Sequence, residues 1–259
     1  MGYLILVLKI LIWILMIGLI SNIVLQRVSY SFYKKAKSFE HIEFKPVKIN
    51  INKKLVGYAY NLDLSSNNVV IMFGGSGYTA FNTIGVYGGF YNCPVFAVDY
   101  YGSQDSLGKM NLKTMKQSAI ELYDWIAEHY SIKNITIIGH SYGAGMASYL
   151  ASVKKCDNLI LLSAYRDLSD LYNRIIPIFH GPMKLFLTNN ISIQLYAKST
   201  TCKVYIFGSY QDHILNEKLQ RKVLNCYKHA KLNIYEKIKH EEYLVNDQVI
   251  AAIKKIIFE

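Results

Sequence analysis

The chain has 259 residues, 52% of them hydrophobic and 18% charged, which excludes the composition of a disordered protein. Its length suits one α/β domain with a large core. The formal net charge of +11 does not indicate nucleic-acid binding, because more than half of the excess lies between Arg27 and Lys54, directly after an apolar run.

The N-terminal segment, residues 1–26, is predicted to be a membrane anchor. Residues 4–20 are apolar except for Lys9, and about 20 apolar residues span a bilayer core of about 30 Å. Lys9 lies early enough for its side chain to reach the near interface. No charged region precedes the run and no A-x-A-like site follows it, which disfavours a cleaved signal peptide. Apolar side chains cover every face, which disfavours a buried soluble helix.

Residues 27–42 are predicted to be a basic linker beside the membrane. Basic residues within about 20 positions of a span tend to stay cytoplasmic, and the segment carries Arg27, Lys34, Lys35 and Lys37. Anionic lipid head groups would account for this charge without any nucleic acid. We therefore expect a membrane protein whose larger part is cytoplasmic.

Residues 43–259 are predicted to form one α/β domain. Residues 43–51 and 55–62 have the alternation of an antiparallel hairpin. Continuous apolar runs, which suit strands buried on both faces, follow at 69–73, 94–98, 135–139, 159–163 and 204–208. Helical patterns alternate with them, most clearly at 112–130, which favours a mostly parallel central sheet flanked by helices.

One segment, residues 166–199, is longer than a crossover helix requires and is predicted to be a short helical cap. It carries many aromatic and apolar residues. Such residues in a cap either line a pocket or pack on the core.

The strongest chemical signal is the pentapeptide Gly139-His140-Ser141-Tyr142-Gly143, which has the form G-x-S-x-G. It follows an apolar strand and precedes a helical pattern, and the motif requires this context. The glycines let the chain turn sharply, so that the hydroxyl of Ser141 points outward as a nucleophile.

A second turn, Gly74-Gly75-Ser76-Gly77, follows the apolar run at 69–73. Amides at such a turn and after the nucleophile can stabilise an oxyanion. We therefore expect the N–H of Gly75 or Ser76 and that of Tyr142 to form the oxyanion hole. A plain strand-to-helix turn is the alternative, whereas a phosphate-binding loop is disfavoured because G-x-x-x-x-G-K-[ST] is absent.

A serine nucleophile needs a base and an acid that orients it, in the chain order Ser, Asp, His. Asp212 follows the apolar run at 204–208, and His240 follows the last strand-like run. We predict that His240 is the base and Asp212 its partner. The alternatives weighed for the acid are Asp167, Asp170 and Glu217, and the other histidines, His180, His213 and His229, are expected to be surface or packing residues.

Residues 44–257 resemble the α/β-hydrolase superfamily, and are most similar to small, single-pass, esterase-like enzymes of bacterial type. The resemblance is carried by residues 139–143, 74–77 and 99–106 and by the order Ser141, Asp212, His240. The family pattern D-x-R-G-x-G-x-S is kept at Asp99 and Gly102, but Tyr101 replaces its arginine. Phe73 stands where the family often has the histidine of the oxyanion turn.

The resemblance implies a serine hydrolase that cleaves an ester through a covalent acyl-enzyme, with no metal or other cofactor. The membrane anchor and the aromatic cap favour a small-molecule or lipid-like acyl substrate. A peptidase or amidase of the same fold is the alternative within the enzymes. A catalytically silent membrane-bound scaffold and a basic membrane-surface adaptor are the alternatives outside them.

Overall fold

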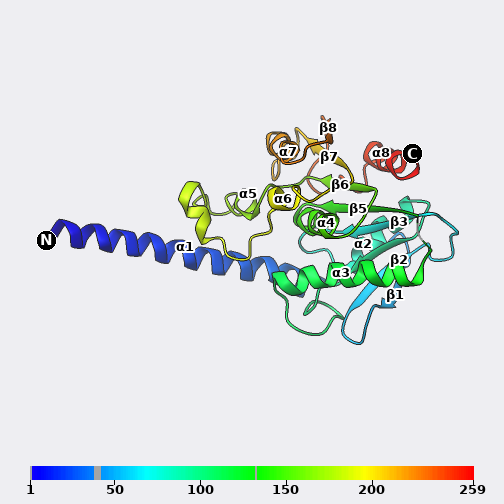
Figure 1. The fold of residues 1–259 in the computed structure, drawn as a ribbon, viewed down its shortest axis with the longest axis horizontal. Helices are drawn as coiled ribbons and strands as arrows, with labels where there is room; N and C mark the ends of the chain where they lie inside the picture. Colours follow the sequence, from blue (N-terminus) through cyan, green and yellow to red (C-terminus); the bar gives the residue numbers. More distant parts are fainter. Residues whose placement is uncertain (1, 38–41, 132) are drawn as a thin grey trace.

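The computed structural model describes residues 2–37, 42–131 and 133–259. Figure 1 shows a long N-terminal helix that projects from an α/β domain. The strands are β1 (Val47–Asn50), β2 (Val56–Tyr60), β3 (Asn68–Phe73), β4 (Val95–Val98), β5 (Asn134–His140), β6 (Asn158–Leu162), β7 (Lys203–Ser209) and β8 (Ala230–Tyr235). The helices are α1 (Gly2–Lys35), α2 (Ala80–Tyr87), α3 (Leu112–His129), α4 (Tyr142–Val153), α5 (Leu168–Tyr172), α6 (Ile193–Tyr196), α7 (Glu217–Leu224) and α8 (Asp247–Phe258), with 3-10 turns η1 (Gly88–Phe90) and η2 (Gly181–Phe186).

Within the described residues, eight strands form one sheet in the order β1-β2-β4-β3-β5-β6-β7-β8. β1 pairs with β2 and β2 with β4 in antiparallel fashion, and the other pairs are parallel. The predicted fold class is confirmed. The carboxyl ends of β3, β5, β6 and β7 therefore meet at one edge, where the loops that follow them come together.

The opening hairpin is shorter than its sequence pattern predicts, at both ends. The amides of Glu43 and Phe44 donate to the carbonyl of Gly85 and so do not join the sheet. Asn61 ends β2 with a φ of 61°, a left-handed conformation that leaves the strand. Backbone hydrogen bonds and backbone conformation decide where these strands begin and end, and the alternation of side chains shows neither.

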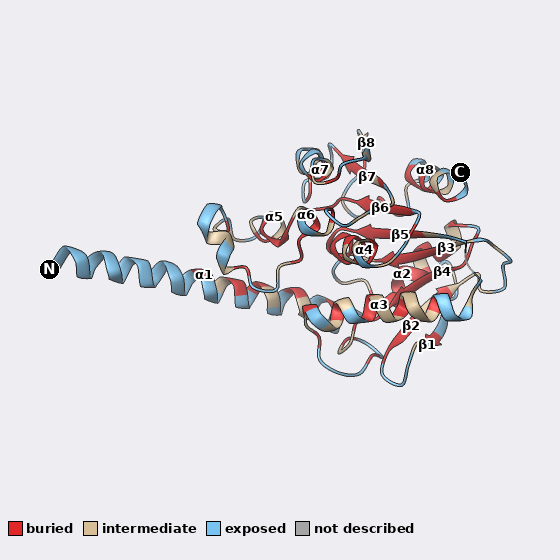
Figure 2. Ribbon diagram, viewed as in Figure 1, coloured by how far each residue is buried: buried red, intermediate tan, exposed pale blue. Residues whose placement is uncertain are grey.

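Side-chain alternation along β3 divides the core into two halves. Val69 and Ile71 pack in the half that α3, α4 and α7 cover. Val70 and Met72 point to the opposite face, under α2 and α8. Neighbouring side chains of a strand point to opposite faces, so a continuous apolar run fills both halves. Figure 2 shows the sheet buried on both sides.

Helix α1 is apolar over most of its length and packs on the domain along one stripe only. It is long and apolar enough to cross a membrane, and lies near the N-terminus. Its buried residues, spaced by three or four, are Gly18, Asn22, Leu25, Ser29 and Tyr33. The helix continues through Lys35, so Arg27, Lys34 and Lys35 of the predicted linker are helical. Residues 38–41 of that linker lie outside the described residues.

The cap meets the first part of this stripe. Gly18 lies so close to Phe186 that an added Cβ would stand 2.5 Å from its ring. Asn22 donates from Nδ2 to Thr188 Oγ1 at 2.8 Å. The predicted cap, residues 166–199, holds only the short helices α5, η2 and α6. It therefore packs against α1 as well as against α4.

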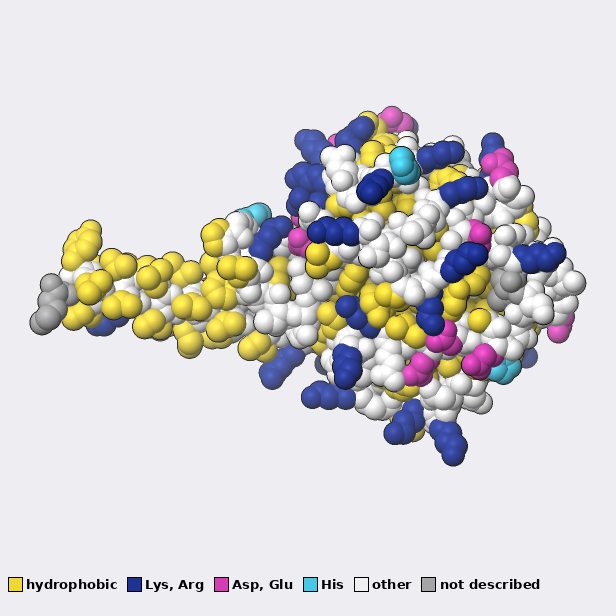
Figure 3. Space-filling model, in the orientation of Figure 1, with side chains coloured by type: hydrophobic (Ala, Val, Ile, Leu, Met, Phe, Trp, Pro, Cys, Tyr) yellow, Lys and Arg dark blue, Asp and Glu magenta, His cyan; other side chains and the backbone are white. Residues whose placement is uncertain are grey.

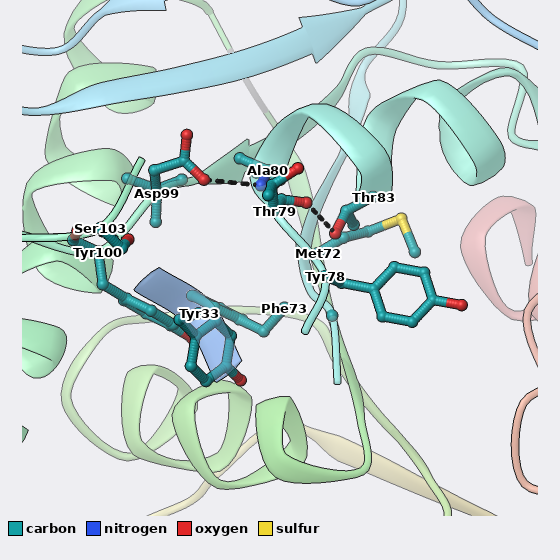
Figure 4. Close-up of a pocket in the computed structure, with 13 residues that line it drawn as sticks. Tyr33, Met72, Phe73, Tyr78, Thr79, Ala80, Thr83, Asp99, Tyr100 and Ser103 are labelled. Atoms are coloured by element: carbon teal, nitrogen blue, oxygen red, sulfur yellow. Dashed lines mark hydrogen bonds between the residues drawn. The ribbon is translucent and has the colours of Figure 1, made fainter. Parts of the chain in front are cut away.

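Tyr33 joins the last part of the stripe to the domain. Its ring lies edge-on to Tyr100 and Tyr142, with centroids 5.3 and 5.8 Å apart. Figure 4 shows Tyr33 with Phe73 at a cavity of about 10 Å³, which the buried Asp99 also lines. The end of α1 is thus part of the hydrophobic core, next to the turn that follows β3.

Candidate active site

Ser141 occupies a sharp turn between β5 and α4. Its φ of 51° and ψ of −121° are strained for a residue with a side chain. A Cβ on Gly139 would stand 2.6 Å from Ala144 Cα, and one on Gly143 would overlap the carbonyl oxygen of Phe73. Only glycine lets the strand, the helix and β3 approach this closely, so the turn needs both glycines of the motif.

The structure brings together the three residues predicted to act on one another. Nε2 of His240 lies 2.9 Å from Oγ of Ser141. Nδ1 of the same ring lies 3.1 and 3.2 Å from the two carboxylate oxygens of Asp212. Because an ionised carboxylate accepts from Nδ1–H, Nε2 is left as the acceptor for the Ser141 proton.

Asp212 is fully buried and held as an anion. Burial by itself would raise its pKa, but hydrogen bonding and charge from His240, with hydrogen bonds from Ser163 and the Leu215 amide, outweigh burial and lower the pKa below its usual value. The amides of Ile214 and Leu215 both donate to Oδ1 at 2.9 Å. The carboxylate is therefore fixed in place before any substrate binds.

Ser163 is a member of this group that the sequence analysis missed. It follows β6 with a φ of 49° and is fully buried. Its hydroxyl donates to Oδ2 of Asp212, and its oxygen lies 3.0 Å from Nδ1 of His240. A serine at the carboxyl end of a buried strand was the available signal, but chain order alone gave it no role.

His140 supports the loop that carries His240. Its Nε2 lies 2.8 Å from the carbonyl oxygen of His240 and donates to it. Burial, followed by the nearby His240, lowers the pKa of His140 to about 4. His140 therefore stays neutral near pH 7 and adds no positive charge beside the base.

The predicted oxyanion residues lie around Ser141. A Cβ built on Gly75 would stand 3.5 Å from Cβ of Ser141, so the turn after β3 passes directly beside Ser141. Tyr142 is the first residue of α4, and its amide has no acceptor among the described residues. First-turn amides of a helix carry partial positive charge. Gly75, Ser76 and Tyr142 thus border the same small space, where Ser76 lines the pocket in front of Ser141.

Two of the alternative acids have other partners. Asp167 accepts from Ser169 and pairs with Lys184 at 3.3 Å. Asp170 pairs with Arg166 at 2.7 Å. Within the described part of the chain, no hydrogen bond joins the His240 ring to any of the other acids and histidines weighed above: Asp167, Asp170, Glu217, His180, His213 and His229.

A pocket of about 300 Å³ opens in front of Ser141. The cap contributes Leu171, Tyr172, Arg174 and Ile175 to its lining. Helix α1 contributes Leu25, Val28, Ser29 and Phe32. The sequence predicts α1 only as an anchor, because a helix that is apolar on every side does not show which face meets the domain. The described residues contain no group of three or more His, Cys, Asp or Glu side chains that could hold a metal ion.

Comparison with known proteins identifies the fold. Residues 89–187 match the family model described as alpha/beta hydrolase fold, a range that includes Ser141 but neither Asp212 nor His240. No curated protein matches the sequence significantly.

Solved structures match most of the chain. An esterase of Pyrococcus furiosus, Pf2001, is 19% identical with a TM-score of 0.63, over 83% of this chain and 89% of its own. An α/β-hydrolase fold protein from Chitinophaga pinensis is 13% identical with a TM-score of 0.64, over 85% and 100%. Est1E from Butyrivibrio proteoclasticus, solved with ferulic acid bound, is 18% identical with a TM-score of 0.59, over 81% and 96%. The family match over residues 89–187 and the similar solved structures show that this chain has the alpha/beta-hydrolase fold.

Proposed function

We propose that this protein is a serine hydrolase that cleaves a carboxylic ester through an acyl-enzyme on Ser141. The observation that carries the proposal is the position of His240, within hydrogen-bonding distance of both Ser141 and Asp212. One of the structurally similar proteins, Pf2001, is named as an esterase, which favours an ester over other acyl substrates.

In the proposed reaction, Nε2 of His240 takes the proton of Ser141 as Oγ attacks the ester carbonyl carbon. Amides of Tyr142 and of Gly75 or Ser76 donate to the oxyanion that forms. His240 then protonates the leaving alcohol. A water molecule, deprotonated by His240, attacks the acyl-enzyme, and His240 returns this proton to Oγ of Ser141 as the carboxylic acid leaves. Asp212 stays ionised and stabilises the imidazolium throughout.

We also propose that α1 anchors the enzyme in a membrane, with the catalytic domain on the cytoplasmic side. The support is the length and apolarity of α1 and the basic residues at its end, Lys34 and Lys35. Protease digestion of sealed vesicles tests the side: the domain should be digested only in inside-out vesicles, and digestion only in right-side-out vesicles would reverse the assignment.

A fluorophosphonate probe tests the proposed nucleophile in membrane fractions. Wild type should be labelled, and Ser141→Ala and His240→Ala should lose labelling. Ser148→Ala is the matched control, because Ser148 is also a buried serine of the same region but contacts Tyr227. If folded wild-type protein takes no label, the result would instead favour a catalytically silent membrane-bound scaffold.

The ester preference is tested separately, with p-nitrophenyl butyrate and butyryl p-nitroanilide. The two compounds share an acyl group and differ in the bond that is cleaved. Faster turnover of the ester supports the proposal, and faster turnover of the anilide would identify an amidase.

A further inference from the structure

The candidate pocket has an apolar mouth that is open to the surroundings of α1. Two of its residues come from α1, Val28 and Phe32, and two from loops of the domain, Ile175 and Ile214. All four are large hydrophobic side chains that remain 39% to 63% exposed. Exposed apolar side chains that gather at one place indicate a surface with an apolar partner.

This mouth lies where the apolar part of α1 ends. Val28, the first of its residues on α1, follows Ile20 by eight residues, or about 12 Å along a helix at 1.5 Å per residue. Figure 3 shows hydrophobic side chains covering α1 from its free end up to the cap. A bilayer around the apolar run would therefore have its surface at the level of the pocket mouth.

The cap supplies a second observation, on the membrane side of the mouth. Phe186 packs on Gly18, which belongs to the apolar run itself. Leu185, its neighbour, is 85% exposed. A leucine that is this exposed and lies beside a membrane-crossing helix would be placed in the interfacial layer of the bilayer. The cap and α1 would then border the mouth together, on its membrane side.

We propose that the substrate is a long-chain acyl ester dissolved in the same membrane as α1, and that its chain reaches Ser141 along the apolar face formed by Val28 and Phe32. The inference rests on the proposed ester hydrolysis at Ser141. It makes α1 a wall of the acyl site, so that residues of the anchor determine chain-length preference.

Transfer of an acyl chain from the bilayer through water to the site would cost free energy. Each CH₂ group that leaves an apolar phase for water costs about 0.8 kcal/mol, so a chain of ordinary lipid length does not pass through water at a useful rate. A path lined by Leu25, Val28 and Phe32 keeps the chain in apolar surroundings from the bilayer to the nucleophile. The ester group then meets the polar groups of the site, while the chain stays against α1.

Two fluorogenic esters with the same leaving group test the inference. The full-length enzyme in phosphatidylcholine vesicles is given 4-methylumbelliferyl oleate or 4-methylumbelliferyl butyrate, and rates are divided by the number of sites that a small fluorophosphonate labels. Val28→Trp, which narrows the mouth, should lower the oleate-to-butyrate rate ratio at least tenfold. Val28→Thr, which has the same shape and a polar group, should lower the ratio about threefold.

Ile23 provides the matched control. It is a β-branched residue of α1, 49% exposed, outside the pocket lining. Ile23→Trp and Ile23→Thr should leave the ratio as in wild type. An unchanged ratio in both Val28 variants, or the same change in the Ile23 variants, would overturn the inference. Neither result bears on ester hydrolysis itself, whose failure would show as equal rates for wild type and Ser141→Ala on both esters.

Discussion

The hydroxyl oxygen of Ser163 lies 3.0 Å from Nδ1 of His240, while its proton is donated to the carboxylate of Asp212. Ser163 thus contacts both partners at the end of the triad that faces away from substrate. A hydroxyl in this position limits rotation of both the carboxylate and the imidazole. In the proposed mechanism, Ser163 is therefore a positioning residue for His240.

Ser163→Ala should lower kcat about tenfold and leave KM nearly unchanged. A hydrogen bond to a charged group contributes about 1.5–3 kcal/mol, and tenfold in rate corresponds to about 1.4 kcal/mol. Steady-state kinetics on p-nitrophenyl butyrate measure the effect. Ser148→Ala, a buried serine bonded to Tyr227, should keep the wild-type kcat. Equal values of kcat in the two variants would remove Ser163 from the site.

Gly143→Ala should abolish the folded state or destabilise it by about 3 kcal/mol or more, because its Cβ would overlap backbone oxygens of Phe73 and Gly74. Gly75→Ala is the comparison. Its Cβ would stand 3.3 Å from Nδ1 of His140, a contact that a small shift relieves. Gly75→Ala should therefore fold, with lower activity, and thermal unfolding in detergent separates the two. A stable Gly143→Ala protein would contradict the close approach of β3 and α4.

Asp99→Asn should stabilise the protein above pH 7 and leave its stability unchanged near pH 3. Burial raises the pKa of Asp99 from 3.8 to about 7, against a hydrogen bond from the Ala80 amide that lowers it. In the unfolded chain the Asp99 carboxyl loses its proton near the usual pKa of 3.8, whereas in the folded chain it loses the proton only near pH 7. Stability therefore falls as pH rises between these values, by at most about 4 kcal/mol at about 1.4 kcal/mol per pKa unit.

The measurement is the melting temperature against pH, with Asp105→Asn as control. Asp105 lies on the same loop, is half exposed, and has its pKa lowered by a hydrogen bond from Lys48. Asp105→Asn should not raise the melting temperature at pH 8. A melting curve of Asp99→Asn that follows wild type at every pH would show that Asp99 ionises normally.

Tyr33→Ala should release the end of α1 from the domain. The buried ring packs on Tyr100 and Tyr142, and removal of a large buried aromatic side chain costs about 3–5 kcal/mol. Trypsin should then cleave faster at Lys34 and Lys35. Val24→Ala, at an exposed position of the same helix, should leave the cleavage rate unchanged. Equal rates in both variants would show that Tyr33 does not hold the helix.

The sequence predicted the parts of the fold and site that depend on local pattern. The turn around Ser141 has its own signature, because only glycine fits at positions 139 and 143. Asp212 and His240 could be chosen from chain order and from their places after strand-like runs, and the structure brings both to Ser141.

What the sequence did not show depends on packing between distant segments. Ser163 gains its contacts only because β6 and β7 are neighbours in the sheet. Leu25 and Phe32 line the pocket because of the direction in which α1 lies across the domain. The sequence of a helix that is apolar on every side does not indicate that direction. The ends of β1 and β2 were misjudged for the same reason, since Gly85 and the φ of Asn61 set them.

Helix α1 runs unbroken from its free end to Lys35, so it fixes the height and the orientation of the pocket relative to the apolar run. A helix couples rotation to depth, at about 100° and 1.5 Å for each residue. The pocket of a protein held in this way has one height above the bilayer and one angular position around the helix axis. In the proposed membrane anchor, one residue inserted into the span would change the height of the pocket and its direction at once.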